Sequence, residues 1–145
     1  MTKLCIFRLF TSPSKWIPGN RRLGRKFEEK GNRTVIIRHY EDVEAVEIME
    51  GVKKRVVIGE QEGAPNFIMR IFELEPGASS PLHDHPWEHE IFVLKGNAAA
   101  RNNFGNETPV GEGSTIFIPP GEEHCLINKG EGILRFMCLI PTGVE

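Results

Sequence analysis

Apolar residues in this chain form short runs that glycine and proline separate. Several runs are rich in Val, Ile and Phe and end at Gly or Pro, which is typical of β-strands. We interpret these runs as strands over residues 35–37, 54–58, 66–74, 90–94, 115–118 and 133–140. The stretch 43–48 alternates imperfectly and fits either a strand or a helical turn. Strands at this spacing, with no sustained helical period, predict an all-β sandwich or barrel.

The N-terminal segment of the chain lacks this strand pattern. Residues 1–33 show no sustained periodicity and contain turn signals at Ser12-Pro13-Ser14 and Pro18-Gly19-Asn20. We therefore expect a single domain in two parts: a flexible N-terminal extension over 1–33 and a barrel over 34–145.

Composition and charge limit the classes of partner that the chain can bind. The chain has 145 residues, of which 39% are hydrophobic and 26% charged, which suits one folded domain. The net charge of −2 divides into +7 over residues 1–33 and −9 over residues 34–145. An acidic domain excludes a global basic field for nucleic acid, and no apolar run is long enough to cross a membrane. We therefore expect neither a nucleic acid nor a membrane as a partner.

Three cysteines are present, Cys5, Cys125 and Cys138, and no pair has the C-x-x-C spacing of a zinc or redox motif. An odd count without such a motif argues against a disulfide framework. The sequence therefore predicts a reducing, cytoplasmic setting.

Histidines supply the candidate chemistry. His83, His85 and His89 fall within seven residues, and His124 lies downstream beside a second Gly/Pro cluster. Residues i and i+2 of a strand share a face, so His83 and His85 should point together, whereas Pro86 requires a turn to return His89. Neutral imidazoles on one face suit a first-row transition metal. The clustering disfavours the alternative that these are ordinary half-buried histidines.

The same residues carry a resemblance to the two motifs of the cupin family. The first motif is resembled by Gly77-x5-His83-x-His85-x3-His89-x6-Gly96. The second is matched by Gly113-x5-Pro119-x-Gly121-x2-His124-x3-Asn128. The resemblance implies the cupin double-stranded β-helix, a jelly-roll barrel, with residues 97–112 forming a short hairpin between the motifs.

One departure from the family pattern concerns the metal ligands. The usual set is two His, one Glu and a later His, but the spacing puts His89 in the Glu position and leaves Glu90 as the reserve ligand. Residues 55–72 and 85–96 closely resemble a subgroup of small single-domain cupins that bind manganese through four histidines and form dimers. The resemblance thus implies a homodimer with one divalent metal per chain, manganese, held by His83, His85, His89 and His124. From the residues alone, imidazole ligation leaves iron, cobalt, nickel, copper and zinc open as well.

Two further residues are candidates for the site. Arg70 interrupts the apolar run 67–72, so it either faces solvent or lines a pocket and holds an anionic group. In the resembling subgroup this position lines the pocket. Cys138 shares one face of the last strand with Phe136 and Ile140. It is either a small buried hydrophobe or a thiol close to the metal.

These features predict a metal-binding cupin with a small-molecule substrate. Four protein ligands leave two positions of an octahedral ion open, which suits a manganese- or iron-dependent oxygenase-type enzyme. A non-redox cupin, such as a sugar isomerase or epimerase, would need an acid–base pair that is not evident near the motifs. A non-enzymatic module that binds a small ligand or metal is the third reading.

The N-terminal extension generates the first testable prediction. Deleting residues 1–33 should leave the melting temperature and metal content of the protein close to those of the full chain, because this segment lacks periodicity and carries the opposite charge to the rest. Thermal unfolding and elemental analysis of both forms check this. A large loss of either property would show that the segment packs on the barrel or completes a dimer.

Overall fold

Residues 35–144 are described in a computed structural model of the chain. The predicted extension over 1–33 lies outside the described residues, as do Thr34 and Glu145. The strands are β1 (Val46–Met49), β2 (Val52–Ile58), β3 (Phe67–Leu74), β4 (His89–Lys95), β5 (Asn97–Asn102), β6 (Glu107–Gly111), β7 (Thr115–Ile118), β8 (His124–Asn128) and β9 (Leu134–Pro141). Two short 3₁₀-helices, η1 (Tyr40–Asp42) and η2 (Glu60–Glu62), complete the regular structure of this part. No helix within residues 35–144 has the length and apolar character needed to cross a membrane.

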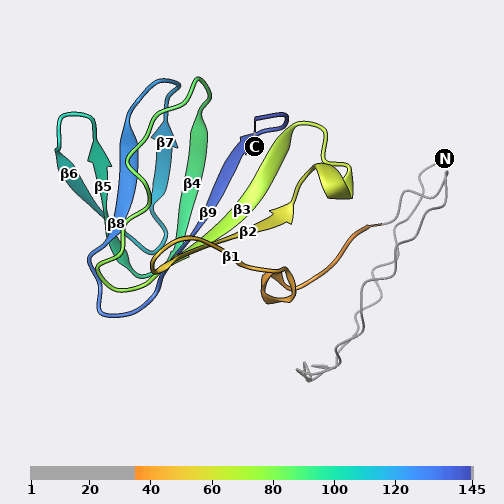
Figure 1. The fold of residues 1–145 in the computed structure, drawn as a ribbon, viewed down its shortest axis with the longest axis horizontal. Helices are drawn as coiled ribbons and strands as arrows, with labels where there is room; N and C mark the ends of the chain where they lie inside the picture. Colours follow the sequence, from red (N-terminus) through yellow and green to blue (C-terminus); the bar gives the residue numbers. More distant parts are fainter. Residues whose placement is uncertain (1–34, 145) are drawn as a thin grey trace, which may run out of the picture. The chain divides into compact units, whose positions relative to one another are not determined.

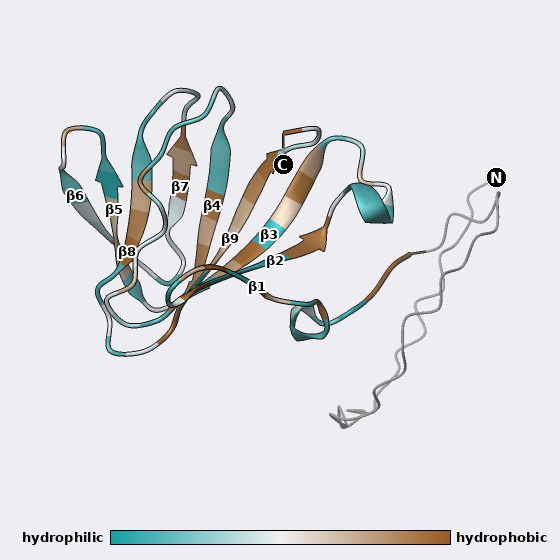
Figure 2. Ribbon diagram, viewed as in Figure 1, coloured by the Kyte–Doolittle hydropathy of each residue, from teal (hydrophilic) through white to brown (hydrophobic). Residues whose placement is uncertain are grey.

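The strands form two antiparallel sheets, as the all-β prediction requires (Figure 1). The larger sheet has six strands in the order β1-β2-β3-β9-β4-β7, and the smaller has three in the order β6-β5-β8. Apolar residues follow β3, β9 and β4, and the loops are mostly hydrophilic (Figure 2). The prediction of an all-β fold is confirmed.

The core lies where the central strands of the larger sheet pack inward. Val52, Val93, Leu134 and Ile140 are almost completely buried there. Phe72 and Phe136 are paired across β3 and β9, and their rings stack with centroids 5.1 Å apart. On β9, Phe136, Cys138 and Ile140 all point into this core, so the predicted inward face of the last strand is confirmed.

Several predicted strand limits need correction. Residues 35–37 are not a strand: Val35 and Ile37 are 85% and 88% exposed and pair with no other segment of the described chain. The stretch 43–48 resolves into a strand that begins at Val46, after η1. The region between the motifs is a hairpin of β5 and β6, as expected. The sequence pattern does not predict β8 as a strand. Its run is short, and histidine and asparagine occupy its ends.

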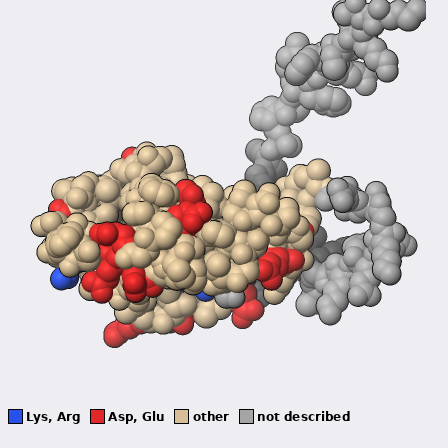
Figure 3. All heavy atoms as spheres, turned by 90° about the horizontal axis from the view of Figure 1, so that it is seen from above, with Lys and Arg blue, Asp and Glu red and all other residues tan. Residues whose placement is uncertain are grey.

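Acidic side chains stand out on the molecular surface. On the face shown in Figure 3, Asp and Glu occur in several groups and Lys and Arg at few points. This agrees with the excess of acids over residues 34–145. A basic stripe for phosphates is not seen on this face.

Gly96 connects β4 to β5 at a point that no other residue suits. Its φ is +95°, in the left-handed region, and a Cβ built there would lie 3.1 Å from the Leu134 Cα and 3.2 Å from the Ile133 carbonyl oxygen. Both neighbours are backbone atoms, so they cannot move aside cheaply. Gly113 has a similar φ of +84°, but open space surrounds its Cβ position.

These two glycines form a matched pair for a stability test. Gly113→Ala should lower the free energy of unfolding by about 1 kcal/mol, the cost of a left-handed alanine. Gly96→Ala should lower it by about 1–3 kcal/mol more, since it adds a backbone clash. Urea unfolding of both variants checks the ranking, and equal losses would contradict the role of the close approach.

Candidate metal centre

The loop that precedes β4 is tied to the start of β8. His83 and His124 form an isolated antiparallel bridge: the His83 N–H donates to the His124 carbonyl at 3.2 Å, and the His124 N–H donates back at 2.9 Å. Two residues on, the Gly121 N–H donates to the His85 carbonyl at 2.8 Å. The turn at Pro119-Pro120-Gly121 therefore holds the loop of the first motif against the strand of the second.

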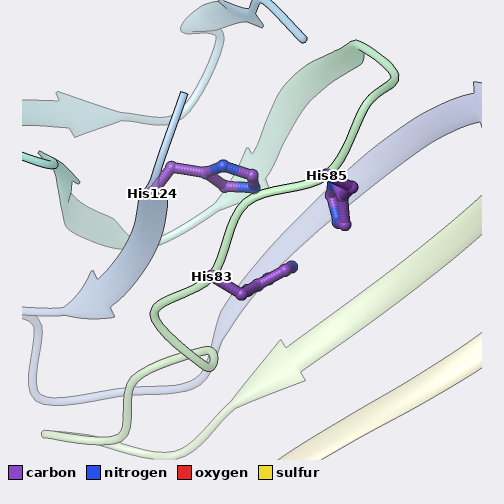
Figure 4. A group of neighbouring side chains, drawn as sticks. All are labelled: His83, His85 and His124. Carbon is purple, nitrogen blue, oxygen red and sulfur yellow. The ribbon is translucent and has the colours of Figure 1, made fainter. Parts of the chain in front are cut away.

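This bridge brings three histidines together. His83, His85 and His124 each offer one ring nitrogen, and the three nitrogens lie within 4.8 Å of one another. Figure 4 shows their side chains converging from the loop and from β8. The His83 ring centroid lies 4.6 Å from that of His85 and 4.9 Å from that of His124. Such a group can hold a metal ion, so the structure supports a three-histidine site.

Backbone carbonyls fix the orientation of two of these rings. The His83 Nδ1 lies 2.7 Å from the Pro81 carbonyl oxygen, and the His124 Nδ1 lies 2.7 Å from the Glu122 carbonyl oxygen. A carbonyl can only accept, so both Nδ1 atoms carry the proton and donate it. The Nε2 lone pairs are then left for a metal, which is how protein histidines are usually oriented for ligation.

Burial and neighbouring charges favour the neutral forms of His85, His89 and His124. Burial, reinforced by the neighbouring imidazoles, lowers the pKa of His85 to about 4. Burial and the Arg70 guanidinium lower the pKa of His89 to about 3, and burial also lowers the pKa of His124. At neutral pH these three rings are uncharged, the form in which imidazole binds a metal.

His89 lies next to this group. It is the first residue of β4, is only 5% exposed, and its Nε2 lies 3.0 Å from the His85 Nδ1 and 3.2 Å from the His85 Nε2. Its ring centroid is 4.9 Å from that of His124. Glu90, the reserve ligand, is the next residue along β4 and is exposed on the opposite face of the sheet.

A cavity of about 150 Å³ opens beside the histidines. Arg70, 8% exposed, and Cys138, 2% exposed, both line it, so the structure places Arg70 in the pocket rather than in solvent. The walls are completed by residues from both sheets and the loop: Ile48, Lys54, Phe72, Ser80, Pro81, Ile91, Leu126 and Phe136.

Lys54 is the charged lining residue that the sequence analysis did not identify; the lining residues Ile48, Phe72, Ser80, Pro81 and Leu126 were not identified either. Lys54 sits in a run of three basic residues, which looks like a solvated face. The signal that could have identified it is the two-residue period of a strand, because Lys54 shares a face with Val52 and Val56. Val52 is fully buried, so this face of β2 points inward.

Fold and site together define a small antiparallel β-barrel protein with a histidine-lined cavity. Residues 70–140 match the cupin domain family. The polyketide cyclase RemF from Streptomyces resistomycificus is 35% identical, with a TM-score of 0.68 over 74% of this chain and 80% of that one. The chain belongs to the cupin family.

Curated relatives are similar over shorter stretches. The oxalate-binding protein of Thermotoga maritima is 36% identical over 69 residues, which is 47% of this chain and 56% of the relative. Auxin-binding protein 1 of Arabidopsis thaliana is 34% identical over 73 residues, 45% of this chain and 37% of the relative. The chain thus spans about half or less of the curated relatives that it matches.

The neutral histidines predict how stability depends on pH. In the unfolded chain their pKa is about 6.5. As the pH falls from about 7 to 4, the unfolded state takes up protons before the folded state does, so the free energy of unfolding of the metal-free protein should fall. Urea unfolding with a chelator present, at steps across this range, measures the slope. His89→Gln should flatten it, and His39→Gln, which removes a histidine outside the cavity, is the control. A profile that stays level would contradict the buried neutral cluster.

Proposed function

We propose that this cupin binds a divalent first-row transition metal through His83, His85, His89 and His124 and acts on a small organic substrate in the adjoining cavity. The observation that carries the proposal is the set of three imidazole nitrogens within 4.8 Å of one another, beside a cavity of about 150 Å³ that His83 and His124 line. The resemblance to four-histidine manganese cupins favours manganese, with iron as the next candidate. The homodimer and the cytoplasmic location stay predictions.

His89 is proposed as the fourth ligand on distance. Two nitrogens bound at right angles to one ion, each at about 2.1 Å, lie about 3.0 Å apart. The His89 Nε2 lies 3.0 and 3.2 Å from the two nitrogens of His85. The two rings stack at 8° with centroids 4.4 Å apart, so one ring would have to turn before both could contact one ion. Glu90 points away and offers nothing equivalent.

In the proposed site, charged and apolar cavity residues would contact different parts of the substrate. A redox-capable ion would supply Lewis acidity and the activation of dioxygen or peroxide. Arg70 and Lys54 would hold an anionic group by charge-assisted hydrogen bonds. Phe72, Ile91 and Phe136 would face the apolar part of the substrate and exclude water from it.

The size of the cavity limits the substrate. A volume of about 150 Å³ equals about five water molecules at liquid density. A compact molecule fits this space, and a long chain would have to extend beyond it. We infer an oxygenase-type reaction on a small organic acid or a similarly compact anion.

A second candidate is binding without turnover. The Thermotoga maritima relative is named for binding oxalate, a small dianion. Two cationic side chains in a small cavity favour the same class of ligand here. In this reading the metal and Arg70 hold the carboxylate and no oxidant is used.

Metal analysis and an activity screen test the proposal together. His124→Ala should remove most of the metal found in the wild type and abolish turnover, whereas Glu90→Gln should retain both because its side chain faces away from the cluster. Elemental analysis of protein purified without added metal measures the first. Product formation from organic acids, alkenes, phenols and diketones, with manganese, iron or copper and with dioxygen or peroxide, measures the second.

The outcomes separate the candidates. Wild-type protein that takes up no metal would overturn the proposal, and metal loss in Glu90→Gln with retention in His89→Gln would overturn the ligand set. Tight binding of an unaltered carboxylate, without turnover under any condition, would favour the binding module over the oxygenase.

A further inference from the structure

A buried polar cluster stands behind His89, on the side of the ring away from His85. The His89 Nδ1 lies 3.1 Å from the Cys138 Sγ and 3.5 Å from the Arg70 Nη2. The Arg70 Nη2 in turn donates to the Cys138 Sγ at 3.0 Å. All three side chains are more than nine-tenths buried. A sulfur atom thus lies at the centre of the contacts around the His89 ring.

The register of the strands brings these three side chains together. Arg70 on β3 is directly opposite Cys138 on β9, and Cys138 is opposite Ile91 on β4. His89 lies two residues before Ile91 and so shares its inward face. The three polar side chains are therefore held by main-chain hydrogen bonds in the middle of the sheet rather than by mobile loops.

Donor and acceptor chemistry determines which atom carries each proton. A guanidinium has only N–H donors, so Arg70 can donate but never accept. The Cys138 thiol lies 3.8 Å from the Leu139 carbonyl oxygen, to which its S–H is directed. The sulfur lone pairs are then the acceptors for Arg70. They are also the nearest acceptor for a proton on the His89 Nδ1, because the other neighbour of that atom is a donor.

We propose that Cys138 is a positioning residue for the fourth histidine. By accepting from the His89 Nδ1–H, the sulfur holds that ring in the tautomer that leaves the Nε2 lone pair for a metal, and Arg70 also donates to the sulfur. Metal-binding histidines commonly donate the N–H of their second ring nitrogen to a carboxylate or a carbonyl. Here the acceptor would be the sulfur of a thiol. The inference rests on the proposed function only for the metal, since the tautomer is a property of the chain itself.

A nearby pair of cysteines allows a controlled test. Cys125, on β8, is buried to a similar degree but makes no hydrogen bond to a ring of the cluster among the contacts described. Cys138→Ala removes the acceptor, Cys138→Ser restores an acceptor of similar size, and Cys125→Ala removes a buried thiol elsewhere. Histidine-selective ¹⁵N NMR of the metal-free proteins reports the tautomer of each ring, and competition titration with Zn²⁺ reports the metal affinity.

We expect His89 of the wild type and of Cys138→Ser to carry its proton on Nδ1. In Cys138→Ala that preference should be lost, and Zn²⁺ affinity should fall about 10- to 100-fold, the usual effect of removing an outer partner of a ligand. Cys125→Ala should match the wild type in both measurements.

Three results would overturn this role. These are a wild-type His89 that carries its proton on Nε2, a Cys138→Ala protein with the wild-type tautomer, and an equal loss of affinity in Cys125→Ala. If the wild type bound no Zn²⁺, the proposed metal function would fail, and the NMR comparison of metal-free proteins would still decide the role of Cys138.

Discussion

The site depends on the pairing of β9 with β3 on one side and β4 on the other. Along β3, eight consecutive residues pair with β9, from Phe67 opposite Pro141 to Leu74 opposite Leu134. This register places a guanidinium, a thiol and, through β4, an imidazole on one inward face. A slip of β9 by one residue would turn Cys138 and the other inward residues of that strand to the opposite face, away from Arg70 and His89. The stacked Phe72 and Phe136 rings and the buried aliphatic residues beside them make such a slip costly, so the packing of the core also specifies the site.

The histidines come from both sheets, which links metal binding to folding. His89 begins β4 of the larger sheet and His124 begins β8 of the smaller one, with His83 and His85 on the loop tied to β8. Gathering uncharged imidazoles in a buried place disfavours their protonated forms, as the lowered pKa values of His85 and His89 show. An ion that contacts rings from both sheets would bind the folded state and not the unfolded one, and would therefore stabilise the fold by mass action.

The second motif also stabilises the fold through Asn128. The Asn128 side-chain amide donates to the Leu74 and Gly132 carbonyls and accepts from the Gly130 N–H, which holds the end of β8 in place.

Local patterns predicted several strands of the larger sheet closely, the edge strand β7 among them. The predicted runs 66–74, 115–118 and 133–140 agree with β3, β7 and β9 to within about a residue, because buried strands read as apolar runs that end at glycine or proline. The run 35–37 looks the same in sequence but lies exposed, since apolar character alone does not supply a pairing partner. Histidine spacing singled out His83, His85 and His124, which the structure brings together, whereas His89, predicted with them, lies beside this group. The contact between Arg70 and Cys138 joins residues far apart in the chain and follows only from the register of β3 and β9, which no local pattern encodes.

The charge of the cavity says more about its ligand than about its reaction. Among the described residues that line it, Arg70 and Lys54 are cationic and none is an Asp or Glu. The usual cupin ligand set includes a carboxylate, which would cancel one charge of a divalent ion; a neutral His89 in that position would cancel none. The Arg70 guanidinium stands 3.5 Å from the same ring. An anion in the cavity would be attracted both to these cationic side chains and to a bound divalent ion, so metal and anion should bind cooperatively. This holds for an oxygenase and for a binding module alike, because one fold hosts both and the walls of the cavity are the same. In the proposed function, Arg70, Lys54 and His89 would therefore determine the class of ligand, and the bound ion would determine the reaction.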